Sequence, residues 1–198
     1  KESSAASDVY KRQIMNILSI GGSDTSSGAG IQSDIKIFSN NGFYPFTVIT
    51  AITSQNTKKI TSIEPVSRRS LELQMESVLS DFQIDAVKIG MLHNTALIKC
   101  IHKILKRYKL KNVVLDPVMI AKGGAKLVKG SSIKYLKKLL IPLCYLITPN
   151  IPEAEVLTGY PISSKEDMIK AAKKIISMGA KNVLLKGGHL KNLSLIHI

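Results

Sequence analysis

The alternation of strand-like and helix-like segments predicts an α/β protein with a doubly wound, mostly parallel sheet. Six apolar runs have strand character, and each of the first five precedes an amphipathic segment with helical spacing. These runs are continuously apolar, which indicates strands covered by helices on both faces. The expected strands are Met15–Ile20, Phe46–Ile52, Asp85–Ile89, Asn112–Asp116, Tyr145–Thr148 and Asn182–Lys186, with Lys59–Pro65 as a short edge or lid strand. The expected helices are Gly30–Asn41, Ser67–Asp81, Ala96–Tyr108, Ser131–Leu140, Pro152–Thr158 and Lys165–Met178.

A glycine- and serine-rich stretch follows the first expected strand. The apolar run Ile14–Ile20 leads into it, and a helical pattern opens near Gly28. Glycine lets the backbone approach a ligand closely, and a helix start offers free N–H groups and a positive dipole end. The stretch has neither the Gly-Lys-Ser/Thr of a Walker A loop nor the spacing of dinucleotide-binding glycines. Two interpretations stay open: a site for a small polar ligand, or a tight strand-to-helix turn.

The strong positive charge comes from lysine and does not indicate a nucleic-acid partner. The chain has 28 Lys and Arg against 14 Asp and Glu, a net charge of +14. Only four of these cations are Arg, Trp is absent, and the Lys residues are scattered over expected helix surfaces. Nucleic-acid-binding domains more often cluster Arg with aromatic residues. The excess of Lys, Ile and Asn is typical of an A/T-rich genome.

The sequence also argues against a membrane span and a disulfide framework. The longest apolar run, Leu139–Ile147, contains Pro142 and is too short to cross a bilayer. Cys100 and Cys144 lack metal-ligand spacing, so we expect reduced thiols in the core of a cytoplasmic protein.

Polar residues and glycines follow the carboxyl ends of the expected strands. In an open parallel sheet these ends meet at one edge, where ligands bind. The strand ends lead to residues 21–24, 53–57, 88–91, 116–119, 148–150 and 186–189. This convergence predicts a ligand site at the carboxyl edge of the sheet.

Three of these strand ends carry groups suited to a metal–nucleotide complex. Asp116 could hold Mg²⁺ or a hydroxyl group, or simply form a turn. Asn150 and Glu153 match a helix cap, yet an amide and a carboxylate also suit Mg²⁺ with phosphate oxygens. Lys186, before two glycines, could face a phosphate or lie at the surface of a turn.

Three further residues suit recognition of a flat polar ring. Gln55, on a loop, both donates and accepts hydrogen bonds. Asp34, about one turn into the first helix, could accept from an exocyclic amine or favour the helix dipole. Met91 could form a soft apolar wall, although Met is common in cores. The four histidines share no metal-ligand spacing and receive no role.

Six strings in this order resemble the hydroxymethylpyrimidine/phosphomethylpyrimidine kinases of thiamine biosynthesis, in the ribokinase-like superfamily. Singly each string is weak, but the ordered set is highly specific and covers nearly all of Ile14–Leu190. The strings are Gly-Gly-Ser-Asp-x-Ser-x-Gly-Ala-Gly-Ile-Gln-x-Asp (21–34), Thr-Ala-Ile-Thr-Ser-Gln-Asn-Thr (50–57), Asp-Ala-Val-Lys-Ile-Gly-Met-Leu (85–92), Asp-Pro-Val-Met (116–119), Thr-Pro-Asn-x-Pro-Glu-Ala-Glu (148–155) and Lys-Gly-Gly-His (186–189).

The resemblance implies a three-layer ribokinase-like fold and ATP-dependent phosphorylation of 4-amino-5-hydroxymethyl-2-methylpyrimidine, then of its monophosphate. Its cofactors would be ATP and Mg²⁺, and relatives are commonly homodimers. Asn150 and Lys186 would meet the ATP phosphates, while Asp116 and Glu153 would position Mg²⁺ and its waters. By the same analogy the pyrimidine pocket would be lined by Gly22, Asp34, Gln55, Met91 and Val118.

The resemblance also raises an expectation about activity. In the family, a glycine-rich anion hole and the proposed catalytic base, Cys in this branch, follow the Lys-Gly-Gly-His string by a few dozen residues. Cys100 and Cys144 do not match that motif, so we assign no catalytic residue. We expect the last strands and helices of the fold to be missing, and this chain to bind pyrimidine weakly with little or no turnover.

The two ends have the character of translated sequencing adaptor. A back-translation of Ser3–Gln13 matches a transposon-type adaptor, and one of Leu193–Ile198 is the reverse complement of the codons for Asp8–Gln13. We therefore expect adaptor at 1–13 and 193–198, and a kinase domain at 14–192.

Alternatives of two kinds stay open for the function, another kinase or a protein of a different class. A pyridoxal/pyridoxine kinase of the same superfamily is one, although Gln55 and Met91 favour the pyrimidine. The other is a non-catalytic pyrimidine-binding relative, or a thiamine-pathway fusion whose partner domain is absent here.

Overall fold

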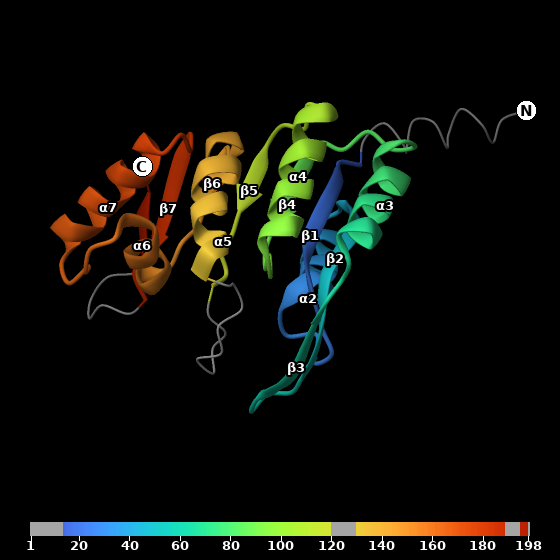
Figure 1. Ribbon diagram of the computed structural model, residues 1–198, viewed down its shortest axis with the longest axis horizontal. Helices are drawn as coiled ribbons and strands as arrows, with labels where there is room; N and C mark the ends of the chain where they lie inside the picture. Colours follow the sequence, from blue (N-terminus) through green and yellow to red (C-terminus); the bar gives the residue numbers. More distant parts are fainter. Residues whose placement is uncertain (1–13, 120–129, 189–194, 198) are drawn as a thin grey trace, which may run out of the picture.

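The computed structural model describes residues 14–119, 130–188 and 195–197 and confirms the predicted α/β architecture (Figure 1). One sheet of eight strands runs in the order β3-β2-β1-β4-β5-β6-β7-β8. The strands are β1 (Asn16–Asp24), β2 (Tyr44–Gln55), β3 (Ile60–Pro65), β4 (Ala86–Ile89), β5 (Val113–Leu115), β6 (Leu146–Ile147), β7 (Asn182–Lys186) and β8 (Leu195–His197). The helices are α2 (Gly30–Asn40), α3 (Arg68–Leu79), α4 (Thr95–Arg107), α5 (Gly130–Tyr135), α6 (Ile151–Thr158) and α7 (Lys165–Ser177).

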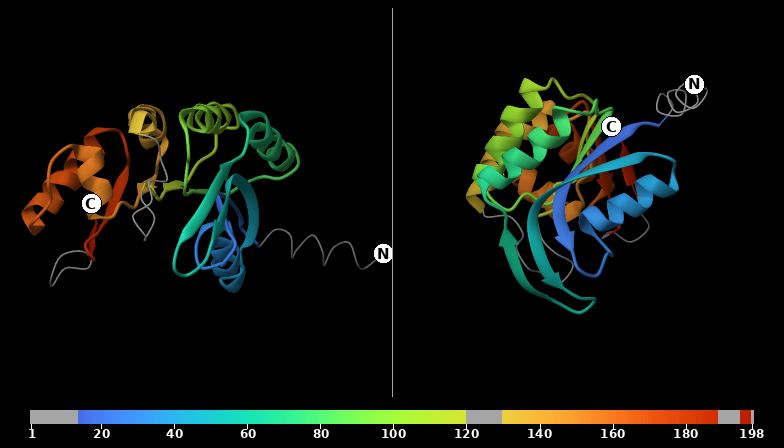
Figure 2. Two further views of the ribbon diagram at one scale, coloured as in Figure 1. Left: turned by 60° about the horizontal axis from the view of Figure 1, so that its bottom comes forward. Right: turned by 90° about the vertical axis from the view of Figure 1, so that its right-hand side faces the viewer.

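The described helices cover both faces of the sheet. The six inner strands, β2, β1, β4, β5, β6 and β7, pair in parallel, whereas β3 and β8 are antiparallel at the two edges. From β1 the chain first moves toward β2, and from β4 it moves the other way, toward β5. Because parallel crossovers are right-handed, this reversal places α2 on one face and α3, α4 and α5 on the other (Figure 2).

The reversal between β1 and β4 also positions the site. Neighbouring strands whose connections leave in opposite directions leave a crevice at their carboxyl ends. The strands beneath that crevice form the centre of the core, where Leu18, Ile20, Val87 and Ile89 are at most 1% exposed. These side chains pack with helices α3 and α4 in one large cluster. A rigid floor therefore supports the predicted ligand-binding edge.

The first strand is longer than its apolar run predicts. We expected it to end at Ile20, but β1 continues to Asp24 because the long strand β2 keeps pairing with it. The register shifts between Gly21 and Gly22, an irregularity of the kind that bends a strand locally. The glycine stretch is therefore partly strand and partly turn.

The predicted helix Ser131–Leu140 is not one regular helix. It divides into α5, a π-helical turn over Leu136–Leu140 and a 3₁₀ turn over Ile141–Leu143. Pro142 explains the irregular end, since it has no N–H to donate and its ring crowds the carbonyl four residues earlier.

The expectations about the two ends stay predictions. Residues 1–13 lie outside the described residues, as does His189 in the Lys-Gly-Gly-His string. Within the second expected adaptor segment, Leu195–His197 forms strand β8 and pairs with β7.

Over the described part of the chain, every helix is too short or too polar to cross a bilayer.

Candidate active site

A cavity of about 550 Å³ opens at the carboxyl ends of β1, β2 and β4. All five residues of the predicted pyrimidine pocket line it, and so does Asp116 at the end of β5. Asn150, Glu153 and Lys186 are not among its lining residues. The full lining is Gly21, Gly22, Ser23, Asp24, Ala29, Gly30, Ser33, Asp34, Thr53, Gln55, Asn56, Thr57, Lys58, Lys59, Ile60, Lys88, Gly90, Met91, Asp116 and Val118.

Two glycines shape the cavity wall through close approach. A Cβ on Gly22 would lie 2.6 Å from Met91 Cε, so the bare backbone makes room for this thioether side chain. Met91 is 8% exposed, and its carbonyl oxygen accepts a hydrogen bond from Thr50 Oγ1 at 2.7 Å. Gly30 has φ of +60°, and a Cβ there would lie 2.3 Å from the Gly22 carbonyl oxygen. The contact at Gly22 is with a flexible side chain, whereas the contact at Gly30 is with backbone, so a larger residue at Gly30 would disturb the wall more.

Asp34 enters the cavity from α2 with two partners beneath it. Its Oδ2 accepts from Ser19 Oγ at 2.5 Å and from Lys88 Nζ at 2.8 Å. Its Oδ1 accepts from Lys88 Nζ at 3.0 Å. Sequence reasoning gave Ser19 and Lys88 no role. In the sequence they stand out only as a Ser and a Lys inside otherwise apolar strands. Because an unpaired polar group is costly to bury there, such residues are expected to have a polar partner.

Asp24 organises the turn between β1 and α2. Its carboxylate accepts from the backbone N–H groups of Ser26 and Ala29, each at 2.8 Å, and from the Ser26 hydroxyl at 2.8 Å. Burial alone would raise the pKa of Asp24, but these hydrogen bonds, with one from the Gln55 side chain, hold it below its ordinary value. Helix α2 has no side-chain cap from its own N-cap residue, Ala29, so Asp24 supplies the acceptor.

On the other side, Asn150 and Glu153 form the capping box of helix α6. Asn150 Oδ1 accepts from the Glu153 N–H at 2.9 Å, and Glu153 Oε2 accepts from the Asn150 N–H at 2.8 Å. Glu153 is only 4% exposed. Burial raises its pKa, and the nearby Asp116 charge raises it further. Helix capping thus accounts for the residue types at both positions. In addition, the buried Glu153 carboxylate near the Asp116 carboxylate would be stabilised by a cation between them.

Lys186 already has a partner at the end of β5. Its Nζ donates to Asp116 Oδ1 at 3.0 Å, and Thr148 Oγ1 donates to the same oxygen at 3.1 Å. The side chains of Lys186 and Asp116 are 40% and 29% exposed, so water screens the pair. This contact links the predicted nucleotide side to the cavity, because Asp116 belongs to both.

The residues predicted to position Mg²⁺ are two carboxylates, Asp116 and Glu153, whose charges interact. Within the described residues, no group of three or more His, Cys, Asp or Glu could hold a metal ion. Mg²⁺ often takes only one or two protein carboxylates and fills its other positions with water and phosphate oxygens. Asp116 and Glu153 fit that donor set, and Lys186 occupies one oxygen of Asp116.

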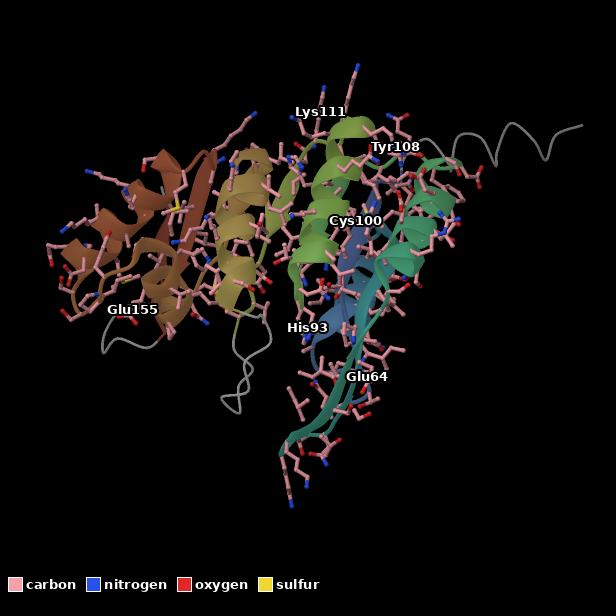
Figure 3. The ribbon with its side chains drawn as sticks, in the orientation of Figure 1. Glu64, His93, Cys100, Tyr108, Lys111 and Glu155 are labelled. Carbon is pink, nitrogen blue, oxygen red and sulfur yellow. The ribbon has the colours of Figure 1, made fainter. Side chains whose placement is uncertain are left out.

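The two cysteines do not resemble activated nucleophiles or bases. Cys100 lies on α4, in the helical layer above the sheet (Figure 3). Burial raises the pKa of its thiol, with Glu72 adding to the effect. Cys144 is buried as well, and this raises its pKa to about 12. Both thiols stay protonated at neutral pH and act as core side chains.

Comparisons with known proteins agree with this geometry. The sequence model of the family described as phosphomethylpyrimidine kinase matches residues 24–197. The hydroxymethylpyrimidine/phosphomethylpyrimidine kinase of Bacillus subtilis is 47% identical over 176 residues, covering 89% of this chain and 65% of the relative. A crystal structure of phosphomethylpyrimidine kinase from Clostridium difficile gives a TM-score of 0.87 at 46% identity, covering 93% of this chain and 80% of that one. The structure of pyridoxal kinase from Staphylococcus aureus in complex with AMP-PCP and pyridoxal gives a TM-score of 0.84 at 33% identity. The match covers 93% of this chain and 68% of that one.

These matches confirm the predicted ribokinase-like fold and settle the family. The chain spans 65% of the length of the Bacillus subtilis enzyme and 36% of the length of the thiamine biosynthesis bifunctional protein of Geobacter sulfurreducens, to which it is 47% identical. The expectation of an inactive chain gains no support from them, since the match runs through most of the described fold. With 174 residues of the chain, 24–197, inside one family match, this protein belongs to the phosphomethylpyrimidine kinase family.

Proposed function

We propose that this protein transfers the γ-phosphoryl group of ATP to 4-amino-5-hydroxymethyl-2-methylpyrimidine and then to its monophosphate. One observation carries the proposal: five residues from four separate segments, all expected to contact the pyrimidine, line a single cavity. Asp116 lies at the margin of that cavity and contacts Lys186, a cation suited to ATP phosphates. The relatives named for this reaction, at 47% and 46% identity, support the same function.

The cavity residues would bind the ring and aim its hydroxymethyl group. Met91 and Val118 offer apolar surface to the ring faces. Asp34 and Gln55 offer an acceptor and an amide to its polar edge. The hydroxyl group would then face Asp116 and Lys186. Its oxygen would form a bond to the γ-phosphorus while the bond from that phosphorus to the β–γ bridging oxygen breaks, so that ADP leaves and the hydroxyl proton passes to water.

The nucleotide side would bind the phosphates and stabilise their charge. Lys186 would exchange its Asp116 contact for a phosphate oxygen, and Asn150 would contribute its amide beside it. Asp116 and Glu153 would hold Mg²⁺, which neutralises phosphate charge when bound. We assign no catalytic base among the described residues, so the proposed catalysis rests on positioning and charge.

The experiment that tests the function is ADP release with ATP and Mg²⁺. The chain would be assayed against hydroxymethylpyrimidine, its monophosphate and pyridoxal, with the Bacillus subtilis relative as a positive control. Turnover on both pyrimidines well above pyridoxal is the expected result. Binding of the pyrimidines without turnover would instead support the earlier expectation of an inactive chain, or a non-catalytic relative.

A second candidate is a pyridoxal kinase, favoured by the fold match to the Staphylococcus aureus enzyme at 33% identity. A cavity of about 550 Å³ lies in the range of small-molecule sites, and both ligands are single six-membered heterocycles. Preference for pyridoxal in the same assay would move the protein to this function. It would also show that Gln55 and Met91 are poor discriminators between the two rings.

A further inference from the structure

A serine and a lysine from neighbouring strands lie side by side beneath Asp34. Ser19 of β1 and Lys88 of β4 are register partners in a parallel pair, so both side chains project from the same face of the sheet. Their neighbours in sequence face the other way, into the core with α3 and α4. The face that they share is covered by α2, the helix that carries Asp34. Two strands and one helix thus converge on one carboxylate.

We propose that Lys88, together with Ser19, is a positioning residue that holds the Asp34 carboxylate aimed into the cavity and thereby sets the preference for a ring with an exocyclic amine. The inference rests on the proposed function, because it concerns the same cavity.

The environment of Lys88 separates it from the many surface lysines. Its side chain is 23% exposed, and that of Asp34 is 13% exposed. Gly90 leaves the space that the ammonium group occupies, since a Cβ there would lie 3.2 Å from Lys88 Nζ. Both Lys88 and Gly90 line the cavity. A lysine packed this way is held in one place, unlike an exposed lysine that moves freely in water.

The hydrogen bonds of Asp34 leave one direction open. Oδ2 accepts from both Ser19 and Lys88, whereas Oδ1 accepts from Lys88 alone. A carboxylate oxygen can accept more than one hydrogen bond, so Oδ1 keeps capacity for a donor in the cavity. Lys88 bridges both oxygens, which restricts rotation of the carboxylate. An N–H donor on the ligand would therefore meet an acceptor already in position.

This arrangement distinguishes ligands by one group. An aminopyrimidine presents an exocyclic N–H to Oδ1, whereas an analogue with hydrogen in place of the amine leaves that oxygen with Lys88 as its single donor and shields it from water. A hydrogen bond to a charged acceptor corresponds to roughly a tenfold to hundredfold difference in affinity. Without Lys88 the carboxylate can turn away, and most of that difference should disappear.

The test is a ratio of two dissociation constants measured by calorimetry on the whole chain. The ligands are 4-amino-5-hydroxymethyl-2-methylpyrimidine and the same compound without its 4-amino group. We expect wild type to prefer the amine by at least about tenfold. The ratio should fall to within about threefold of unity in Lys88→Met. The matched control is Lys103→Met, an exposed lysine on α4 at the opposite face, which should keep the wild-type ratio.

A double-mutant cycle separates positioning from simple structural support. If Lys88 acts through Asp34, then Lys88→Met in an Asp34→Asn background should change the ratio by less than twofold. Ser19→Ala, a smaller change in the same contact, should lower the ratio in part. Lys88→Arg keeps the charge and should retain more of the preference than Lys88→Met. If Lys88→Met fails to fold, the ratios for Ser19→Ala and Lys88→Arg still test the positioning role.

The outcomes distinguish the two proposals. A wild-type preference for the amine that persists in Lys88→Met and in Ser19→Ala would overturn the positioning role and leave the pyrimidine function intact. Equal losses of affinity for both ligands in Lys88→Met, with an unchanged ratio, would show a purely structural ion pair. Wild type that binds pyridoxal but neither pyrimidine would overturn the proposed function, and this inference with it.

Discussion

The cavity side and the nucleotide side of the candidate site are built in different ways. On the cavity side, Asp34 is held by Ser19 and Lys88, which are 15 and 54 residues away in sequence. On the nucleotide side, Asn150 and Glu153 form reciprocal hydrogen bonds within one helical turn. One side is assembled by contacts between distant strands and helices, and the other mostly by a local cap.

This difference decides how mutations should act. A local cap forms whenever its helix forms, so a residue in it can have a structural role without any function. A long-range contact orders a side chain only when several elements are already packed, which ties its geometry to the cavity. We therefore expect substitutions on the cavity side to lower stability and pyrimidine affinity together. On the nucleotide side, the effect of a substitution on stability should be separable from its effect on ATP affinity.

The largest expected effect comes from Gly30→Ala on the cavity side. The residue has φ of +60°, and the new Cβ would lie 2.3 Å from the Gly22 carbonyl oxygen. An alanine at this position would be strained in the left-handed backbone conformation, and its Cβ would overlap the Gly22 carbonyl group. Together these two effects should lower the free energy of unfolding by roughly 2–5 kcal/mol. Chemical denaturation would measure this loss, and pyrimidine binding should weaken with it.

Gly42→Ala is the matched control for that prediction. Gly42 also has a positive φ, +78°, but a Cβ there would meet nothing within 4 Å. It should lose only the strain, about 1–2 kcal/mol, and keep pyrimidine affinity. Equal losses in the two variants would show that the close approach to Gly22 has no special importance.

Asn150→Ala tests whether the nucleotide side has more than a capping role. Asn94 caps α4 in the same manner, with its Oδ1 accepting from the Leu97 N–H at 3.1 Å. Both Asn→Ala variants should lose about 1 kcal/mol of stability in thermal unfolding. Only Asn150→Ala should also weaken ATP binding, by roughly tenfold if it removes one hydrogen bond to a charged phosphate. Unchanged ATP affinity would reduce Asn150 to a helix cap.

The smallest effect is a pH trend at Glu153. Because its pKa is raised above the ordinary value of 4.5, the folded state holds its proton longer than the unfolded state does. Stability from this group is therefore present below about pH 4.5 and is lost as pH rises through the raised pKa. Glu153→Gln keeps an acceptor for the capping box and removes this loss.

The measured quantity is the difference in melting temperature between Glu153→Gln and wild type from pH 4 to 8. It should shift in favour of the variant as pH rises through the raised pKa of Glu153. Any constant offset reflects the hydrogen bond from the Met119 backbone, which a neutral amide accepts less strongly. A difference that does not change with pH would contradict the raised pKa and weaken the case for a cation beside Asp116.

Much of the fold could be predicted from sequence because its signals are local. Continuous apolar runs at Phe46–Ile52 and Asn182–Lys186 identified buried strands, and the Asn150-to-Glu153 spacing identified a helix start that the structure confirms. Each of these depends on a few neighbouring residues. The order of strand ends then placed the candidate residues on one edge, since parallel strands share a direction.

What the sequence could not supply is the pairing of elements far apart in the chain. The extension of β1 to Asp24 depends on β2, and the contact between Lys88 and Asp34 depends on β1 and β4 being neighbours with α2 above them. The same holds for Lys186 and Asp116, which are 70 residues apart. Residue types and their spacing thus determined the fold class, the capping box and the edge that carries the site. Only tertiary packing decided which polar side chains meet there, because a hydrogen bond between distant residues forms after the chain entropy between them has already been lost.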